Sequence, residues 1–267
     1  MSLASSLRAT PTLWRVGLAD ALAYRAEMFV WIVATTMPLI MMALWTTVAR
    51  EAPVGRFGEE QFVAYFLATF IVRQLASSWA AWQLSYEVRE GLLSQRLLRP
   101  VHPIWHMAVE SWAALPLRLV VALPVAILAL VLLGARQLPT DARIWPIWLV
   151  AMAGAWVLTF LTNVAIGSLC FYLESSLKVM EVWLALFFVL SGYLIPIEVF
   201  PPALRRIVQV LPFRFQIGFP VELMTGRYGI GEALHMLAAQ WGWVAIMLVV
   251  AGNLWHRGLR RFEAYGG

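Results

Sequence analysis

The chain has 267 residues, of which 61% are hydrophobic and only 13% are charged. An average soluble domain carries about 25% charged residues, so this chain has too little charge to coat a water-soluble globule. The composition and the mean hydropathy of +0.75 argue against a soluble enzyme, a disordered tail or a secreted disulfide scaffold, and they indicate an all-α integral membrane protein.

The basic excess of the chain points to membrane lipids as partners. The formal net charge is +5 at pH 7, which in a soluble protein suggests nucleic acid. In a chain this apolar, cytoplasmic loops and anionic lipid headgroups account for the same excess. We therefore expect lipids and no nucleic acid as partners, and the single cysteine, Cys170, rules out a disulfide within the chain.

A segment before the first apolar run, Thr12–Glu27, combines helical spacing of its apolar residues with several charges. This pattern predicts an amphipathic helix that lies on the membrane surface. The alternative is that the segment forms the first turns of a longer membrane span.

The sequence predicts six membrane-spanning helices in one transmembrane domain over residues 1–267. A span needs about 20 mostly apolar residues, and the six candidate segments are 28–49, 62–82, 112–133, 145–169, 179–195 and 234–254. Six spans place both tails, residues 1–27 and 255–267, on one side of the membrane. Ten basic residues fall on that side and eight on the other, a weak bias that favours cytoplasmic termini.

Arg73 lies near the middle of the second predicted span, with Gln74 beside it and Ser77 one turn further on. A charge at this depth costs about 2.5–3.5 kcal/mol on insertion scales, so it faces the bundle or a wet cavity. Arg73 therefore either contacts an anionic substrate or is held by a carboxylate such as Glu181 or by helix carbonyls. Arg118, nearer a span end, is expected to snorkel towards the surface. The candidate substrate-pathway residues are Arg73, Gln74, Ser77 and Asn163.

Residues 83–111, between the second and third spans, form the most charged stretch of the chain. Charged residues and leucines alternate there, Gly91 weakens a helix interior, and Pro100 and Pro103 end a helix. The pattern predicts a short cytoplasmic helix that offers ion pairs and an apolar anchor to a partner. A plain solvated loop is the alternative.

Residues 196–231, between the fifth and sixth spans, combine five prolines with apolar runs too short to cross a membrane. Segments of this kind are re-entrant or interfacial helices. Just before them, Ser191-Gly192-Tyr193 places small residues where the fifth helix can bend or pack closely.

The sequence carries no nucleotide-binding or metal motif. A phosphate-binding loop needs Gly-Lys-Ser or Gly-Lys-Thr, and the only lysine, Lys178, follows a leucine. His102, His106 and Glu110 have the four-residue spacing of ligands on one helix face. Pro103 interrupts that face, so headgroup or water contacts are expected there in place of a metal.

Three groups of short motifs stand out along the chain: Ala23-Tyr24-Arg25-Ala26-Glu27; Gly91-Leu92-Leu93 with Leu97-Leu98-Arg99-Pro100; and Ser191-Gly192-Tyr193 with Pro196-Ile197-Glu198 and Phe200-Pro201. In these motifs and in the order of its elements, the chain resembles the membrane subunits of type-2 ABC exporters. The likeness is strongest to a bacterial six-helix subfamily of small permeases, and the third group of motifs is the most specific.

The resemblance implies a role for each segment outside the spans. The surface helix becomes a connecting helix, and the hairpin at 196–231 becomes extracellular and re-entrant. The implied gate residues of the hairpin are Pro196, Glu198, Phe200 and Pro201. The implied coupling-helix residues, which sit on an ATPase, are Glu87, Arg89, Glu90, Leu92, Leu93, Arg96 and Leu97.

The resemblance also implies an assembly. Two permease chains, identical or paralogous, sit over two ABC ATPase subunits in a bacterial inner membrane, with both termini of each permease in the cytoplasm. ATP and Mg are bound by the ATPase subunits, so no cofactor is expected on this chain.

Two other functions stay open from the residues alone. One is a membrane-embedded enzyme that acts on lipid headgroups through Arg73, His102, His106 and Glu110, although no nucleophile or metal constellation forms around them. The other is a secondary transporter, for which Glu181 is the only carboxylate inside a predicted span.

Overall fold

The computed structural model describes residues 3–24, 35–133 and 138–262, together with residues 26, 30 and 33. In these residues the regular structure is helical, apart from one isolated bridge between Val54 and Phe57. The α-helices are α1 (Leu3–Ala23), α3 (Met37–Glu51), α4 (Glu59–Leu75), α5 (Ala80–Arg89), α6 (Leu92–Leu97), α7 (Pro103–Ala113), α8 (Leu115–Leu133), α9 (Ile144–Gly167), α10 (Ser176–Leu190), α11 (Pro202–Val210), α12 (Pro212–Gln216), α13 (Gly218–Met224) and α14 (Ile230–Leu259). Two 3₁₀ turns, η2 (Ser168–Phe171) and η3 (Ile197–Val199), complete the set.

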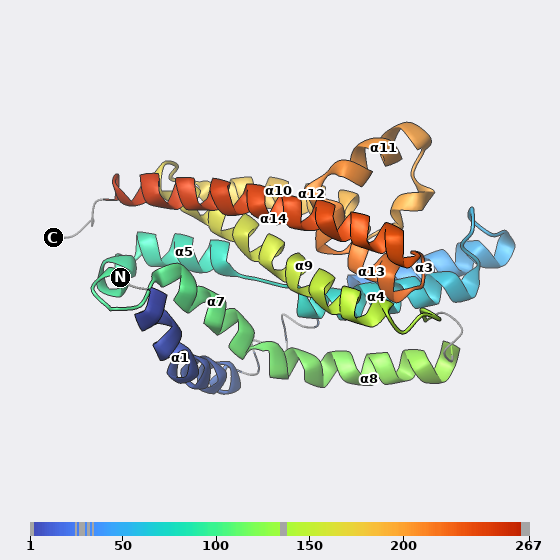
Figure 1. The fold of residues 1–267 in the computed structure, drawn as a ribbon, viewed down its shortest axis with the longest axis horizontal. Coiled ribbons are helices and arrows are strands. Elements are labelled where there is room, and N and C mark those ends of the chain that lie inside the picture. Colours follow the sequence, from blue (N-terminus) through green and yellow to red (C-terminus); the bar gives the residue numbers. More distant parts are fainter. Residues whose placement is uncertain are drawn as a thin grey trace.

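The long helices run along the longest axis of the molecule (Figure 1). The centre of the bundle is α9, which packs along α14 and also against α5, α12 and α13. The short helix α6 and the described ends of the chain lie at one end of the bundle, here called the α6 end. The helix α11 and the connection from α3 to α4 lie towards the other, here called the hairpin end (Figure 1).

Within the residues that the structure describes, four stretches of helix are long and apolar enough to cross a membrane. They are Glu59–Arg89, Pro103–Leu128, Ile144–Phe171 and Ile230–Leu259, and each contains or overlaps one of the predicted spans. The other two predicted spans are represented by shorter helices, because α3 and α10 have 15 residues each. Such helices extend about 22 Å, less than the roughly 30 Å hydrocarbon core. Part of the predicted span 28–49 lies outside the described residues.

The second span is interrupted at residues 76–79, where the chain leaves the helix between α4 and α5. The interruption leaves backbone carbonyls without helical partners, which inside a bundle must be satisfied by other groups. The guanidinium of Arg118 on α8 donates to the Ser77 carbonyl at 3.1 Å. Arg118 is 3% exposed, so the prediction that it snorkels to the surface is wrong: its charge is needed inside, at the broken helix.

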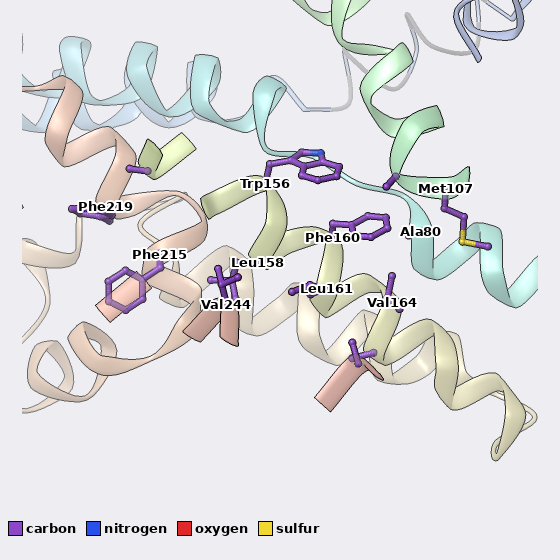
Figure 2. Close-up of a cluster of buried hydrophobic side chains, with 14 of the residues drawn as sticks. Ala80, Met107, Trp156, Leu158, Phe160, Leu161, Val164, Phe215, Phe219 and Val244 are labelled. Carbon is purple, nitrogen blue, oxygen red and sulfur yellow. The ribbon is translucent and has the colours of Figure 1, made fainter. Parts of the chain in front are cut away.

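The core lies around α9, which is buried on most of its circumference. Figure 2 shows part of this cluster, with the labelled side chains Ala80, Met107, Trp156, Leu158, Phe160, Leu161, Val164, Phe215, Phe219 and Val244. In contrast, the stretch Pro103–Leu128, which covers α7 and most of α8, and the stretch Ile230–Leu259, which is α14, are only 22% and 17% buried over their most apolar parts. Their exposed leucines, valines and isoleucines suit contact with lipid, because a bilayer solvates apolar side chains as well as a protein core does.

The N-terminal helix is longer than predicted and packs inward. It begins at Leu3 and contacts α7, where a Cβ added at Gly17 would lie 2.9 Å from the Cβ of Ala113. The Trp105 indole donates to Thr10 at 3.1 Å, and the His102 amide donates to Ser6 at 3.1 Å. The first turns of α1 are therefore fastened to the segment that leads into α7. Residues 25 and 27 of the predicted surface helix lie outside the described residues.

The proline-rich segment 196–231 folds as short helices. Its first α-helix, α11, is amphipathic, with Val208 fully buried and Ile207 and Val210 exposed by 57% and 65%. The following α12 is buried throughout, and α13 is buried except at its last residue. They pack against α9, and α13 also packs against α4. The amide of Gln240 on α14 holds this arrangement by donating to the carbonyls of Ala151 and Phe215.

Candidate functional site

An ion cluster lies inside the α6 end of the bundle. The chain turns back at Gly91, whose φ of +70° favours glycine, so α6 folds back and Arg96 reaches Glu87 on α5 at 2.9 Å. Arg96 also contacts the ring of His106 and lies 3.7 Å from the carboxylate of Glu110 on α7. Glu87 is only 3% exposed. The cluster therefore fastens α5, α6 and α7 to one another.

The outer surface of the same turn combines apolar and charged side chains. Leu98 is 88% exposed and Tyr86 is 60% exposed. Leu92 and Glu90 are exposed beside them. We call this surface, made of Tyr86, Glu90, Leu92 and Leu98, the coupling turn, after the coupling helix that the sequence resemblance implies here.

The predicted coupling residues thus divide into two sets. Glu87 and Leu93 point into the protein, and Arg96 and Leu97 are half-buried. The exposed ones are Arg89, Glu90 and Leu92. Arg89 donates to the backbone carbonyl of Glu174 at 2.7 Å. The alternation of charges and leucines predicted a docking helix but gave no sign of the reversal at Gly91, which decides which side chains face out.

A second charged cluster lies in the hairpin. The carboxylate of Glu222 on α13 accepts from Arg214 on α12 at 2.8 Å, and both side chains are at most 5% exposed. Glu222 also accepts from Arg227 at 3.0 Å and from the hydroxyl of Tyr228. Burial raises the pKa of the Tyr228 phenol, and the Glu222 carboxylate beside it raises that pKa further. The phenol therefore stays protonated and donates to the carboxylate.

The predicted gate residue Glu198 joins this cluster. Its carboxylate pairs with Arg227 and, at 2.5 Å, with Arg56 from the connection between α3 and α4. Pro196 is buried, Phe200 is half-buried and Pro201 is exposed, so the four predicted gate residues do not share one surface. Arg214 and Glu222 were missed by sequence reasoning, because they lie eight residues apart across a break between two short helices. In the sequence, the only feature that could have indicated this pair is that both residues are charged within an otherwise apolar segment.

A partly open cavity of about 210 Å³ is bounded by α4, α5, α9, α10 and α12. Its lining residues are Thr35, Arg73, Ser78, Trp79, Trp82, Thr159, Asn163, Met180, Trp183, Leu184, Phe187, Phe188 and Gln216. Of the predicted pathway residues, Arg73 and Asn163 line this cavity. Gln74 and Ser77 do not: Gln74 donates to Thr35 at 2.9 Å, and Ser77 donates to the Gln74 carbonyl at 3.3 Å.

The guanidinium of Arg73 has no carboxylate partner within the described part of the chain. Glu181, the carboxylate considered as its internal counter-ion, is exposed on α10 and makes no ion pair with it. Arg73 lies over the ring of Phe187, 5.3 Å from its centroid, and interacts with the phenol of Tyr193. Sequence reasoning missed Gln216 and the aromatic lining residues of α10 (Trp183, Phe187 and Phe188), because α10 and α12 come from distant parts of the chain.

The residues of the rival lipid enzyme are not gathered in one place. Arg73 lines the cavity, whereas His106 and Glu110 belong to the ion cluster of the α6 end, with 3.2 Å between them. His102 stands apart, with its ring 5.8 Å from that of Trp255. Among the described residues, no group of three or more His, Cys, Asp or Glu side chains is placed to hold a metal ion.

The comparison with known families agrees with this architecture. A family model described as ABC-2 family transporter protein matches residues 28–266, which include the four stretches of described helix that are long enough to cross a membrane. A search of the curated proteins finds no match for this chain. The matched region covers most of the sequence, and the chain therefore belongs to the ABC-2 family of transporter proteins, as a multi-pass membrane component.

Proposed function

We propose that this chain is the permease subunit of an ATP-driven exporter in a bacterial inner membrane. It has six spans with both termini in the cytoplasm. Two permease chains, identical or paralogous, enclose the translocation pathway, and two separate ATPase subunits bind ATP and Mg. Support comes from the family match over residues 28–266 and from the likeness of its motifs to small bacterial permeases.

The observation that carries this proposal is the coupling turn. Two helical stretches long enough to cross a membrane, Glu59–Arg89 and Pro103–Leu128, are joined at the α6 end through this turn. Leu98, next to Arg99, is exposed by 88% and so presents most of its apolar surface to the surroundings. Such a side chain suits a groove on a soluble protein, where burial of apolar area stabilises binding by about 25 cal/mol per Å². An ATPase that moves this turn moves both helices.

The hairpin supports the direction of the pathway. It lies towards the end of the bundle opposite the coupling turn (Figure 1) and is held there by the pairs of Glu198 and Glu222 with arginines. In this proposal the hairpin dips into the outer leaflet and closes the outer end of the pathway. Backbone at that depth needs protein partners, and α12 and α13 have them in α9 and α4.

The test compares substitutions of exposed side chains with a substitution of a buried side chain, all at the α6 end. Leu92→Asp and Leu98→Asp together place charges where an apolar groove is expected. We expect them to reduce co-purification of the ATPase at least about tenfold, equivalent to 1.4 kcal/mol, while the melting temperature of the permease is unchanged. Gln95→Asp is the matched control, because Gln95 is an exposed polar residue of the same helix.

The substitution of the buried side chain is Glu87→Ala, which leaves Arg96 without its closest carboxylate. It should lower the melting temperature of the permease without acting directly on the ATPase contact. If the double aspartate variant binds the ATPase and exports as the unaltered chain does, the coupling turn has no part in assembly and the proposal loses its main support.

A further inference from the structure

The cavity between α4, α5, α9, α10 and α12 holds a positive charge that the described chain does not neutralise. The Nε atom of Arg73 is buried without a hydrogen-bond partner, and none of the ion pairs of the described residues includes Arg73. The buried Arg118 on α8 adds a second positive charge in the neighbourhood of Arg73. A guanidinium at this depth is costly unless an anion or water faces it.

Two buried amides leave hydrogen-bonding atoms unpaired around the same cavity. Asn163 is 3% exposed, and its amide nitrogen donates to the Thr159 carbonyl while its oxygen has no partner. Gln216 is 2% exposed, and its amide nitrogen has no partner. Buried polar atoms are nearly always paired, so an unpaired donor and an unpaired acceptor on two residues that line one cavity indicate a ligand that completes them.

Aromatic side chains form much of the lining of the same cavity, here called the aromatic wall. Trp82, Trp183, Phe187 and Phe188 line the cavity with flat, apolar surfaces. Their area favours a planar apolar body, and their faces stack on rings. A cavity of about 150 Å³ holds one benzene ring, so the 210 Å³ found here suits a body of one to two fused rings or a short bent chain.

We propose that this cavity binds a small organic monoanion with a flat apolar body and one further N–H or O–H group. The carboxylate or sulfonate accepts from Arg73 and Gln216, the donor group meets the Asn163 oxygen, and the body lies against the aromatic wall. This inference rests on the proposed transport function, for which it names the class of substrate. Neutral and cationic molecules of the same shape are rejected, because they leave the arginine charge uncompensated.

The experiment measures equilibrium binding to the purified chain in phosphatidylcholine nanodiscs. The probes are radiolabelled 6-hydroxy-2-naphthoate, 2-naphthoate, and the neutral 6-hydroxy-2-naphthamide. We expect saturable binding of one 6-hydroxy-2-naphthoate per chain. The neutral amide should bind at least about tenfold more weakly, and loss of the hydroxyl should weaken binding several-fold.

Variants assign each contact. Arg73→Gln should weaken binding of the two acids at least about tenfold and leave the amide unchanged, whereas Arg73→Lys should retain part of the affinity. Asn163→Leu should abolish the preference for the hydroxylated acid. Arg206→Gln is the matched control, because Arg206 is an exposed arginine of α11 remote from the cavity lining. Gel filtration checks folding, and Gln216→Leu serves as a second anion-site variant should Arg73→Gln fail to fold.

A competition arm identifies the source of the anion. Displacement of 6-hydroxy-2-naphthoate by oleate, or by phosphatidylglycerol built into the nanodisc, supports the site with a lipid as its natural occupant. Absence of displacement supports the site with a soluble aromatic acid as its natural occupant. The inference is overturned if the acid and its amide bind equally, if no probe binds saturably, or if both anion-site variants bind the acid as the unaltered chain does. Loss of ATPase assembly with binding intact contradicts the proposed function alone.

Discussion

At the scale of single residues, one glutamine decides how closely the central helices approach. The amide nitrogen of Gln240 on α14 donates to the carbonyls of Ala151 and Phe215, at 3.0 and 2.9 Å. Gly154 on α9 makes room for it, because a Cβ added there would lie 2.7 Å from the Gln240 oxygen. Small residues at such contacts are how membrane helices pack closely.

Gly154→Ala should therefore destabilise the bundle. The added methyl group displaces the amide and breaks hydrogen bonds worth about 1–2 kcal/mol in model membrane helices, so the melting temperature in detergent should fall. The control is Gly242→Ala on α14, where an added Cβ meets nothing within 4 Å and helix propensity alone favours alanine. Equal melting temperatures for the two variants would contradict the tight contact.

The buried ion pair of Arg214 and Glu222 gives a second prediction for single residues, about the stability of the hairpin. Glu222→Ala leaves a buried guanidinium without its carboxylate, a change that costs about 3–5 kcal/mol. The melting temperature should fall strongly. Glu59→Ala breaks the exposed pair with Arg50, whose side chains are 66% and 46% exposed in the order Arg50, Glu59, and should have little or no effect. If the two variants lowered the melting temperature equally, the buried pair would contribute no more to stability than the exposed pair does.

At the scale of elements, the sequence predicted where the helices lie along the chain better than it predicted which of their side chains are buried. Long apolar runs define α9 and α14 from the sequence, because a bilayer demands about 20 apolar residues in a row. The prolines at 196–231 correctly predicted segments too short to span. Burial was less predictable. In the sequence, Glu87 and Glu90 have similar surroundings, and so do Arg96 and Arg99. In the structure, Glu87 and Arg96 face inward while Glu90 and Arg99 are exposed, because the chain reverses at the left-handed Gly91.

The hairpin gives a prediction for topology. After Cys170→Ser, single cysteines are placed at the exposed Arg206 and the buried Val208 of α11. An impermeant maleimide added to intact cells should label the cysteine in Arg206→Cys, while Val208→Cys should react poorly, because its side chain faces protein. Labelling of the first variant only after cell lysis would place the hairpin in the cytoplasm. Equal labelling of both would describe a solvated loop.

At the scale of the whole molecule, the separation of transport from ATP hydrolysis is open to test. The sequence has one lysine, and it lies outside any phosphate-binding loop. The purified chain alone should therefore hydrolyse no ATP, and activity should appear only on reconstitution with its ATPase partner. Turnover by the isolated chain, measured as phosphate release from a preparation shown by mass spectrometry to be free of ATPases, would contradict the subunit assignment.

The candidate site was predictable in part. Arg73 and Asn163 stand out in the sequence as polar residues within apolar spans, and both line the cavity. Trp183 and Gln216 gave no such signal, because an aromatic residue in a span is ordinary and α12 is brought to the cavity only by the tertiary fold. A single sequence shows which residues are costly to bury. It does not show which distant segments of the chain pack against those residues.

The interruption of the second span at residues 76–79 has a mechanical consequence. Ser78 and Trp79 of this interruption line the cavity, and α5 runs from it to the coupling turn, where the ion cluster of Arg96 clamps it to α7. A continuous helix transmits a tilt along its whole length, whereas a broken one pivots at the break. In the proposed assembly, a displacement of Leu98 by the ATPase therefore tilts α5 about the break at residues 76–79, and this break forms part of the wall of the proposed anion cavity.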